Sequence, residues 1–202
     1  MAFGYPVALE LAGRRCVVVG TGPVAEEKVK GLLDAGASVA VIAPAAYRRG
    51  DLAGAFLVIA ASGDPGVNRA VFAEAEDERV LCNAVDDVDH CHFAAPSVLR
   101  RGDLVVAIST GGRSPALAKR LRADLAERLG PELGVLTEVL GDLRAELMVS
   151  RHRVDFATWA HRWESALDND LAGLVRAGRL DEVRDVVRRT VAGPEARKEA
   201  VA

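Results

Sequence analysis

The most chemically suggestive stretch of this chain is residues 82–93, which read CNAVDDVDHCHF. The first of these residues complete a predicted strand. The polar residues that follow are therefore expected at the carboxyl edge of a sheet, where open α/β folds bind their ligands. At such an edge the carboxylate of Asp86 can act as a general base or hold N–H groups of a substrate. A loop aspartate that caps the next turn explains the same residue equally well, so both interpretations stay open.

The same stretch contains Asp89, His90, Cys91 and His92, whose side chains are all of types that ligate transition metals. Adjacent side chains point in different directions, and no second cluster with ligand spacing accompanies them. The sequence therefore predicts a polar loop that enters a turn at residues 94–96, and no metal site.

A second stretch, residues 15–25 (RCVVVGTGPVA), runs from an apolar strand into a turn with the spacing G-x-G-x-x-A. Gly20 permits the tight turn, Gly22 lets the backbone approach a pyrophosphate, and Ala25 lets the next helix pack closely on the strand. That helix begins at Pro23 and aims its N–H groups and positive dipole end at the phosphates. Because a strand, a helix and a second strand surround the turn in this order, we expect a nucleotide cofactor here.

The third stretch, residues 109–115 (STGGRSP), also follows a strand and opens a helix. Its N–H groups and the guanidinium of Arg113 favour an anion, and carboxylate groups of a substrate are good candidates. A glycine hinge between two domains, with Ser114 as an ordinary helix cap, explains the stretch as well. The two interpretations are compatible with each other.

Five runs rich in Val and Ile predict the strands that must position these stretches. They are nearly unbroken by polar residues, as strands buried on both faces should be. The predicted strands are residues 15–19, 38–43, 56–61, 80–85 and 104–109. Helical stretches alternate with them, notably at 24–35 and 65–76. This alternation predicts an α/β fold with a Rossmann-like, mainly parallel sheet that carries helices on both faces.

The strands stop after residue 112, and an all-helical region follows. A helix is expected from Pro115 to about residue 129, a break at 130–131, and another helix to about residue 148. The chain therefore divides into residues 1–112, 113–148 and 149–202. In the last part Trp159 and Trp163 lie four residues apart on one helix face and are expected to pack.

The connection between the second and third predicted strands is unusually short. Only residues 44–55 join them, where a nucleotide-binding half normally fits another helix and strand. Either the sheet lacks an edge strand, or this sequence lacks a segment.

Bulk composition excludes several classes of protein. The net charge is −3, which leaves no basic surplus for binding nucleic acid. No apolar run approaches the length of a membrane span, and the first residues do not read as a secretory signal. Three cysteines without a C-x-x-C pair indicate a reduced, cytoplasmic setting.

Together these stretches make the chain similar to the precorrin-2 dehydrogenase family, the N-terminal module of siroheme synthases. The resemblance covers nearly the whole chain, and its specificity lies in the combination of segments rather than in any one of them. The main segments are VGTGPVAEEK (19–28), VIAP (41–44), GDLAGAFLVIAA (50–61), CNAVD (82–86) and STGGRSPALA (109–118).

This resemblance implies a homodimeric enzyme that oxidises precorrin-2 to sirohydrochlorin with NAD⁺, with residues 113–148 building the dimer contact and part of the active site. Asp86 matches the family's functional aspartate, and Ser114 lines the substrate cleft together with Gly112 and Arg113. Positions that contact NAD, or lie at the strand ends under the nicotinamide, are Gly20, Gly22, Pro23, Val24, Ala25, Pro44, Ala45, Ala61, Ser62, Asn83 and Val85.

The sequence departs from the family at the adenosine side of this site. The usual segment after Pro44 is absent, and so is the acidic residue that normally binds the ribose, while Arg48 and Arg49 keep NADP open as an alternative. Two further readings also stay open. The enzyme can be bifunctional and insert ferrous iron into sirohydrochlorin, with Asp86 taking up pyrrole protons, or the chain can be a nucleotide-binding module without catalysis.

Overall fold

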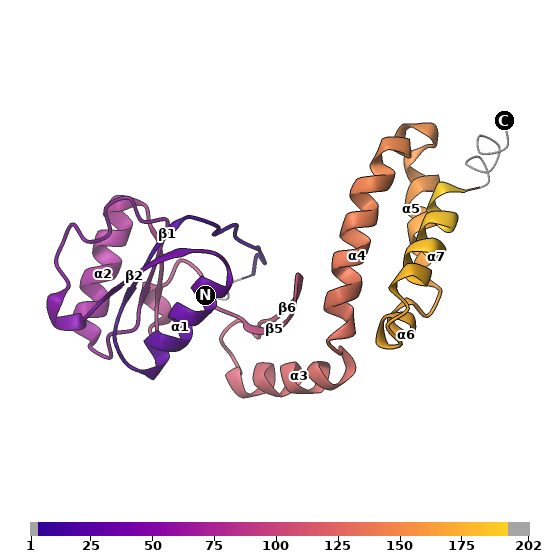
Figure 1. Cartoon of the computed structure of the whole chain (residues 1–202). Coiled ribbons are helices and arrows are strands. Elements are labelled where there is room, and N and C mark those ends of the chain that lie inside the picture. The colour runs from indigo at the N-terminus through magenta and orange to yellow at the C-terminus, as the bar shows by residue number, and fades with distance from the viewer. Residues whose placement is uncertain (1–3, 194–202) are drawn as a thin grey trace. The chain divides into compact units, whose positions relative to one another are not determined.

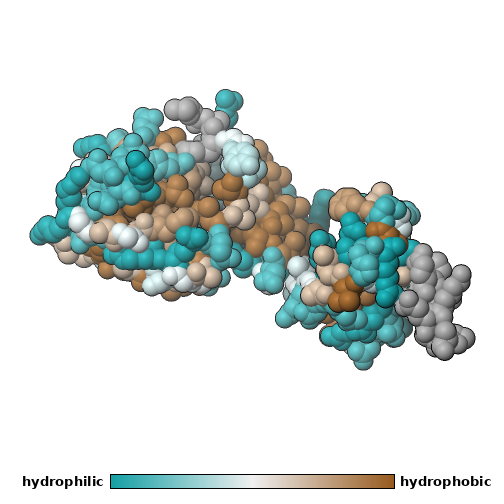
Figure 2. All heavy atoms as spheres, turned by 90° about the horizontal axis from the view of Figure 1, so that it is seen from above, coloured by the Kyte–Doolittle hydropathy of each residue, from teal (hydrophilic) through white to brown (hydrophobic). Residues whose placement is uncertain are grey.

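The computed structural model describes residues 4–193, which form two compact units. The first unit contains residues 4–95 together with Thr110–Ser114, and the second contains Pro96–Ser109 and residues 115–193 (Figure 1). Among these residues, no helix is long and apolar enough to cross a membrane. On the face drawn in Figure 2, each unit presents hydrophilic as well as hydrophobic residues.

The first unit is built on a four-stranded parallel sheet with the order β2-β1-β3-β4. The strands are β1 (Arg15–Val19), β2 (Ser38–Ile42), β3 (Leu57–Ala60) and β4 (Leu81–Ala84). Alternate residues of the central strands enter two separate cores, one with helix α2 (Pro65–Glu78) and one with helix α1 (Pro23–Asp34). The expected Rossmann-like α/β fold is confirmed, and the apolar strand runs follow from burial on both faces.

The short connection between β2 and β3 contains a single 3₁₀ turn, η1 (Pro44–Ala46), followed by hydrogen-bonded turns. No strand pairs with the outer side of β2, so β2 is an edge of this sheet in the described residues. Val41 on β2 is accordingly 52% exposed.

A buried carboxylate holds this connection in place. Glu74 of α2 is 2% exposed and accepts hydrogen bonds from the N–H groups of Gly50 (3.0 Å) and Leu52 (2.9 Å). Its other oxygen accepts the hydroxyl of Tyr47 at 2.6 Å. Burial and the neighbouring Glu74 raise the pKa of the Tyr47 phenol, so this hydroxyl stays a donor at neutral pH. Glu74 thus holds the connection in place by accepting hydrogen bonds that a helix or strand would otherwise satisfy.

The second unit begins with an antiparallel hairpin of β5 (Ser97–Arg101) and β6 (Leu104–Ile108). The sequence correctly predicted a strand at 104–109, but its assignment to the parallel sheet was wrong, because it pairs only with β5 in a separate two-stranded sheet. The preceding strand β5 was not predicted.

Helices complete the second unit. They are α3 (Pro115–Arg128), α4 (Glu132–Leu147), η3 (Met148–Arg153), α5 (Phe156–Leu167), α6 (Leu171–Arg176) and α7 (Leu180–Ala192). The apolar faces of α4, α5, α6 and α7 form one core that contains Leu143, Leu171 and Val187, while α3 contacts β5 and β6. Trp159 and Trp163 pack edge to face in it, with ring centroids 6.1 Å apart, as their spacing predicted.

Candidate functional site

Hydrogen bonds just past the strand ends align the predicted site segments along one edge of the sheet. The N–H of Gly20 donates to Ile42, that of Ala61 to Val19, and that of Val85 to Ala60, at 2.9, 2.8 and 2.9 Å. The chain leaves β1 toward β2 on one side, while β3 and β4 lie on the other. The carboxyl ends of β1 and β3 therefore form a topological switch point, where doubly wound sheets bind their ligands.

Gly20 is required by the fold itself. Its φ is +153°, and a Cβ added there would lie 2.3 Å from the carbonyl oxygen of Ala61. The same Cβ would lie 3.1 Å from the Cβ of Ala25, which is 1% exposed beneath the turn. The ends of β1 and β3 consequently approach each other more closely than any other residue at position 20 would permit.

Gly22 has no comparable role in the packing of the chain. Its backbone is extended (φ −89°, ψ 178°), a conformation open to any residue, and an added Cβ would meet nothing within 4 Å. It is the N-cap of α1, and no side chain caps that helix end within the described residues. The glycine leaves open space directly above the N–H groups of the first turn, beside Pro23 and Val24. This cradle fits a phosphate group.

The loop after β3 is held by a buried amide. The hydroxyl of Ser62 donates to Oδ1 of Asn68 at 2.6 Å, and the N–H of Ser62 reaches the same oxygen at 3.3 Å. Asn68 is 6% exposed, on the first turns of α2. Ser62 therefore shapes the loop through its hydroxyl and can meet a ligand mainly through its backbone. Sequence reasoning assigned Asn68 no role, although a polar residue on the buried face of α2 was a signal.

Asn83 joins β4 to the chain that returns after the next turn. Its Nδ2 donates to the carbonyl of Phe93 at 2.8 Å, and residue 83 forms an isolated antiparallel bridge with Cys91. The amide nitrogen of Asn83 is therefore engaged with the returning chain. The bridge closes the loop that carries Asp86.

Asp86 adopts a left-handed backbone conformation (φ +62°) immediately after Val85 at the end of β4. Few residues other than glycine take this conformation, and aspartate is among those that do. Its side chain is exposed, and no residue among 4–193 forms a hydrogen bond or ion pair with its carboxylate. The carboxylate at this edge is thus available to a ligand.

The histidines of the same loop are each engaged with a carboxylate. Nδ1 of His90 lies 2.8 Å from Asp87, and Nε2 of His92 lies 2.5 Å from Glu76. The N–H of Cys82 donates to Nδ1 of His92 at 3.0 Å, which places the ring proton of neutral His92 on Nε2. Within residues 4–193 no group of three potential metal ligands is found.

At the end of β2, Pro44 is half-buried and Ala45 is exposed on the 3₁₀ turn. The side chain of Arg48 folds back over this turn, and its Nη1 donates to the carbonyls of Ala45 (2.9 Å) and Tyr47 (2.7 Å). Arg48 is also the first charged residue after the end of β2, so the charge nearest to this strand end in sequence is positive.

Residues 110–114 belong to the first unit and form a compact turn. The N–H of Arg113 donates to the carbonyl of Thr110 at 3.2 Å, and the N–H of Ser114 donates to the hydroxyl of Thr110 at 3.0 Å. Gly112 has φ +78°, and an added Cβ would meet nothing within 4 Å. Gly112 and Arg113 are exposed, as an anion-binding turn requires.

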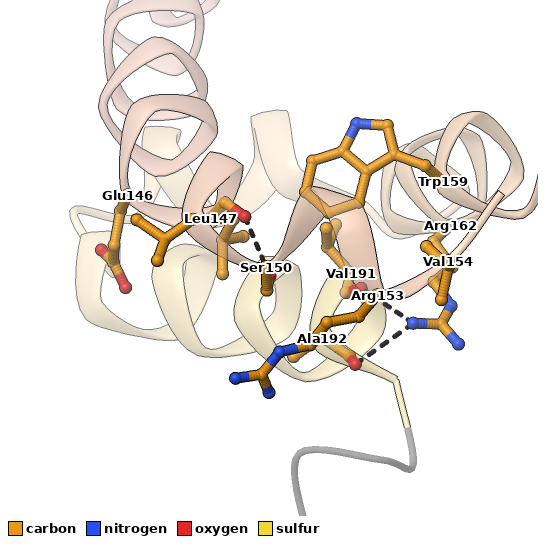
Figure 3. Close-up of a pocket in the computed structure, with 10 residues that line it drawn as sticks. Glu146, Leu147, Ser150, Arg153, Val154, Trp159, Arg162, Val191 and Ala192 are labelled. Carbon is orange, nitrogen blue, oxygen red and sulfur yellow. Dashed lines mark hydrogen bonds between the residues drawn. The ribbon is translucent and has the colours of Figure 1, made fainter. Parts of the chain in front are cut away.

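A cavity of about 270 Å³ lies elsewhere, among the helices of the second unit (Figure 3). Trp159 and Ser150 line it, and Arg162 beside it donates to the carbonyls of Val191 and Ala192 at the end of α7. None of the predicted site residues lines this cavity. The arginine there serves the helix end, where a cation is favoured.

Comparison with known proteins agrees with this geometry. Residues 7–97 match the family model described as putative NAD(P)-binding, and residues 101–128 match that of the sirohaem biosynthesis protein central region. Siroheme synthase of Photobacterium profundum is 33% identical over 198 residues, which cover 89% of this chain and 42% of that protein. Siroheme synthase 1 of Pectobacterium atrosepticum is 37% identical over 198 residues, covering 88% and 40%. The chain thus spans about two fifths of the length of these relatives.

A solved structure matches over a larger share of its length. SirC, a precorrin-2 dehydrogenase, superimposes with a TM-score of 0.68 at 27% identity, over 92% of this chain and 99% of that one. The chain is thus similar in sequence to siroheme synthases, and in both sequence and fold to a precorrin-2 dehydrogenase.

Proposed function

We propose that this chain oxidises precorrin-2 to sirohydrochlorin with NAD⁺ in siroheme biosynthesis. The observation that carries the proposal is the match to a precorrin-2 dehydrogenase over 99% of that enzyme's length, at an identity that relates the sequences as well as the folds. The switch-point edge supports it, because a nucleotide cradle past the end of β1 and an available carboxylate past the end of β4 lie at the same edge of the sheet, on either side of β3.

The chain's own groups divide the work of binding along this edge. The N–H groups of α1, above Gly22, hold the pyrophosphate, and the turn at Pro44 and Ala45 supports the adenosine half. The ends of β3 and β4, at Ala61 and Val85, support the nicotinamide ring. When bound, NAD⁺ supplies a hydride acceptor.

Asp86 removes the proton. Conversion of precorrin-2 to sirohydrochlorin takes one hydride and one proton from the macrocycle, so a base must complement the hydride acceptor. The Asp86 carboxylate has no partner among the described residues and lies just past a strand end on the cofactor edge. The turn of Gly112, Arg113 and Ser114 presents the exposed guanidinium of Arg113 to carboxylate groups of the substrate.

The active form is a homodimer, in which residues 113–148 and the β5–β6 hairpin contribute the contact. On the hairpin, Val98, Arg100, Val105 and Ala107 share one exposed face, opposite the face that contacts α3. A two-stranded sheet with an apolar outer face is marginal unless a further layer covers it.

A cytoplasmic setting fits the thiols. Cys16, Cys82 and Cys91 are all free, and burial raises the pKa of the Cys82 thiol to about 12. Unpaired thiols are typical of reducing compartments.

An anaerobic absorbance assay with precorrin-2 and NAD⁺ tests the activity. The expected result is NADH formation together with the spectrum of sirohydrochlorin, both absent without the protein. NAD binding without turnover would contradict the proposal and leave a nucleotide-binding module. Ferrous iron added afterwards distinguishes a pure dehydrogenase, whose iron step matches a protein-free control, from a bifunctional enzyme, whose iron step is faster.

A further inference from the structure

The adenosine side of the cofactor edge has the opposite charge from that of a typical NAD site. NAD-specific dinucleotide sites place an aspartate or glutamate just after the second strand to bind the ribose 2′-hydroxyl, and NADP sites place an arginine nearby for the 2′-phosphate. Here Ile42 ends β2, and the residues that follow it are Ala43, Pro44, Ala45 and Ala46, none of them acidic.

Arg48 is the cation nearest to this strand end in sequence, and its side chain is held over the turn. Two hydrogen bonds from Nη1, to the carbonyls of Ala45 and Tyr47, fix the guanidinium above the residues that support the adenosine half. Its Nε and Nη2 make no hydrogen bond to another residue in the described part of the chain, and the residue is exposed. A planar donor pair is thus left for a ligand, and this geometry matches a phosphate.

The backbone around Arg48 is anchored from below. Tyr47 on one side bonds the buried Glu74, and Gly50 on the other side donates to the same carboxylate. The N–H of Arg48 itself donates to Asp51 at 2.7 Å. Arg48 therefore sits on an anchored turn in the short connection that follows β2.

The neighbouring Arg49 does not share this role. Its guanidinium pairs with Asp77 of α2 and is thereby directed away from the turn over which Arg48 folds. The two arginines thus differ in their partners, since Arg48 bonds the turn after β2 and Arg49 pairs with α2.

We infer that Arg48 is a specificity-determining residue which admits the 2′-phosphate, so that this chain binds NADP⁺ at least as tightly as NAD⁺. The inference rests on the proposed cofactor site. It adds that Arg48, on the turn that follows β2, favours binding of the 2′-phosphate.

Isothermal titration calorimetry of the full chain with NAD⁺ and with NADP⁺ tests this directly. The expected result is a comparable or lower Kd for NADP⁺ in the wild type. Arg48→Ala should weaken NADP⁺ about tenfold or more, the loss of a charge-assisted contact, while NAD⁺ changes less than about twofold. Arg48→Lys should recover part of the NADP⁺ affinity, because it restores the charge without the planar fork.

Arg49→Ala is the matched control, since it removes the same charge one residue away, and it should leave the NADP⁺ to NAD⁺ ratio unchanged. An equal loss in both variants would overturn the assignment to Arg48 in favour of bulk charge. NAD⁺ binding with NADP⁺ at least tenfold weaker in the wild type would overturn the inference and leave the proposed function intact. Binding of neither dinucleotide would overturn the cofactor site itself.

Discussion

At the scale of single residues, the site depends on two conformations that only particular residue types accept. Asp86 occupies a left-handed position with its carboxylate exposed, and Gly20 occupies one that the neighbouring Ala61 closes to any side chain. Strained or restricted positions of this kind cluster at functional sites because the surrounding structure must hold them. Here the bridge from Asn83 to Cys91 and the parallel ladder supply that constraint.

Asp86→Asn tests the base without disturbing the backbone, because asparagine also accepts the left-handed conformation. We expect the rate of precorrin-2 oxidation to fall about 10²–10⁴-fold while the Kd for NAD⁺ stays within about twofold. Stopped-flow NADH formation and calorimetry measure the two quantities. Asp89→Asn, another exposed aspartate of the same loop, is the control and should keep full activity. A wild-type rate in the Asp86 variant would remove this carboxylate from the mechanism.

The two glycines of the turn separate structural from ligand-binding demands. Gly20→Ala drives a Cβ into the Ala61 carbonyl, so we expect a loss of about 1–3 kcal/mol in the free energy of unfolding. Gly22→Ala meets no protein atom, so its cost is below about 1 kcal/mol, the difference between the two residues at an N-cap.

Affinity for the cofactor, unlike stability, should depend strongly on Gly22. Gly22→Ala fills the space above the helix end, and we expect the Kd for NAD⁺ to rise about tenfold or more although the fold is intact. Urea unfolding and calorimetry on the same preparations give both values. An unchanged Kd would show that no phosphate approaches Gly22.

At the scale of elements, the shortened connection between β2 and β3 is stabilised by one carboxylate instead of a helix. Glu74→Ala leaves the N–H groups of Gly50 and Leu52 and the hydroxyl of Tyr47 without their acceptor. Since an unsatisfied buried polar group costs about 1–3 kcal/mol, we expect the free energy of unfolding to fall by at least about 2 kcal/mol.

Glu78→Ala provides the comparison on the same helix, because Glu78 is exposed at its end, and should change stability by less than about 0.5 kcal/mol. Tyr47→Phe removes only one of the three donors and should lie between the two, near 1 kcal/mol. Equal stability of the Glu74 and Glu78 variants in urea would mean that the connection holds itself without the carboxylate.

The elements that sequence alone predicted are those with a strong local signal. Strands β1 and β3 are continuous apolar runs because helices cover both of their faces, and α1 is announced by its glycines and Pro23. Strand β5 escaped prediction because it is half exposed, follows Pro96 and ends in two arginines. Strand β6 was placed in the wrong sheet for a different reason. The pairing partner of a strand depends on tertiary structure, and the residues of the strand itself do not encode it.

The site shows the same division. The glycine turn and the position of Asp86 after a strand were readable, because both depend on neighbours in sequence. The roles of Glu74 and Asn68 were not, because their partners are backbone groups of loops whose path only the folded chain defines. A buried carboxylate bound to main-chain N–H groups leaves no pattern in residue types.

At the scale of the whole molecule, the β5–β6 hairpin raises the question of what covers it. Alternation places Leu99 against the helices of its own unit, at 5% exposure, while Val98 and Val105 on the opposite face are 41% and 43% exposed. Leu117 and Leu121 on α3 are 50% and 40% exposed as well. α3 itself packs against the other face of the hairpin. A second copy of the chain is the occupant we propose for the outer face of the hairpin, since exposed apolar residues gathered on one face of a sheet are typical of homodimer contacts.

Val105→Glu tests that proposal, because a carboxylate buried at the centre of an apolar contact without a partner costs several kcal/mol. We expect the wild type to elute as a dimer in size-exclusion chromatography with light scattering and the variant as a monomer with an unchanged far-UV spectrum. Val149→Glu, an equally apolar and 80% exposed position on η3, should remain dimeric. If the wild type is itself a monomer at the concentration of the assay, or if both variants stay dimeric, the hairpin face is not the contact. Dissociation by Val149→Glu alone would instead move the interface to the turn that follows α4.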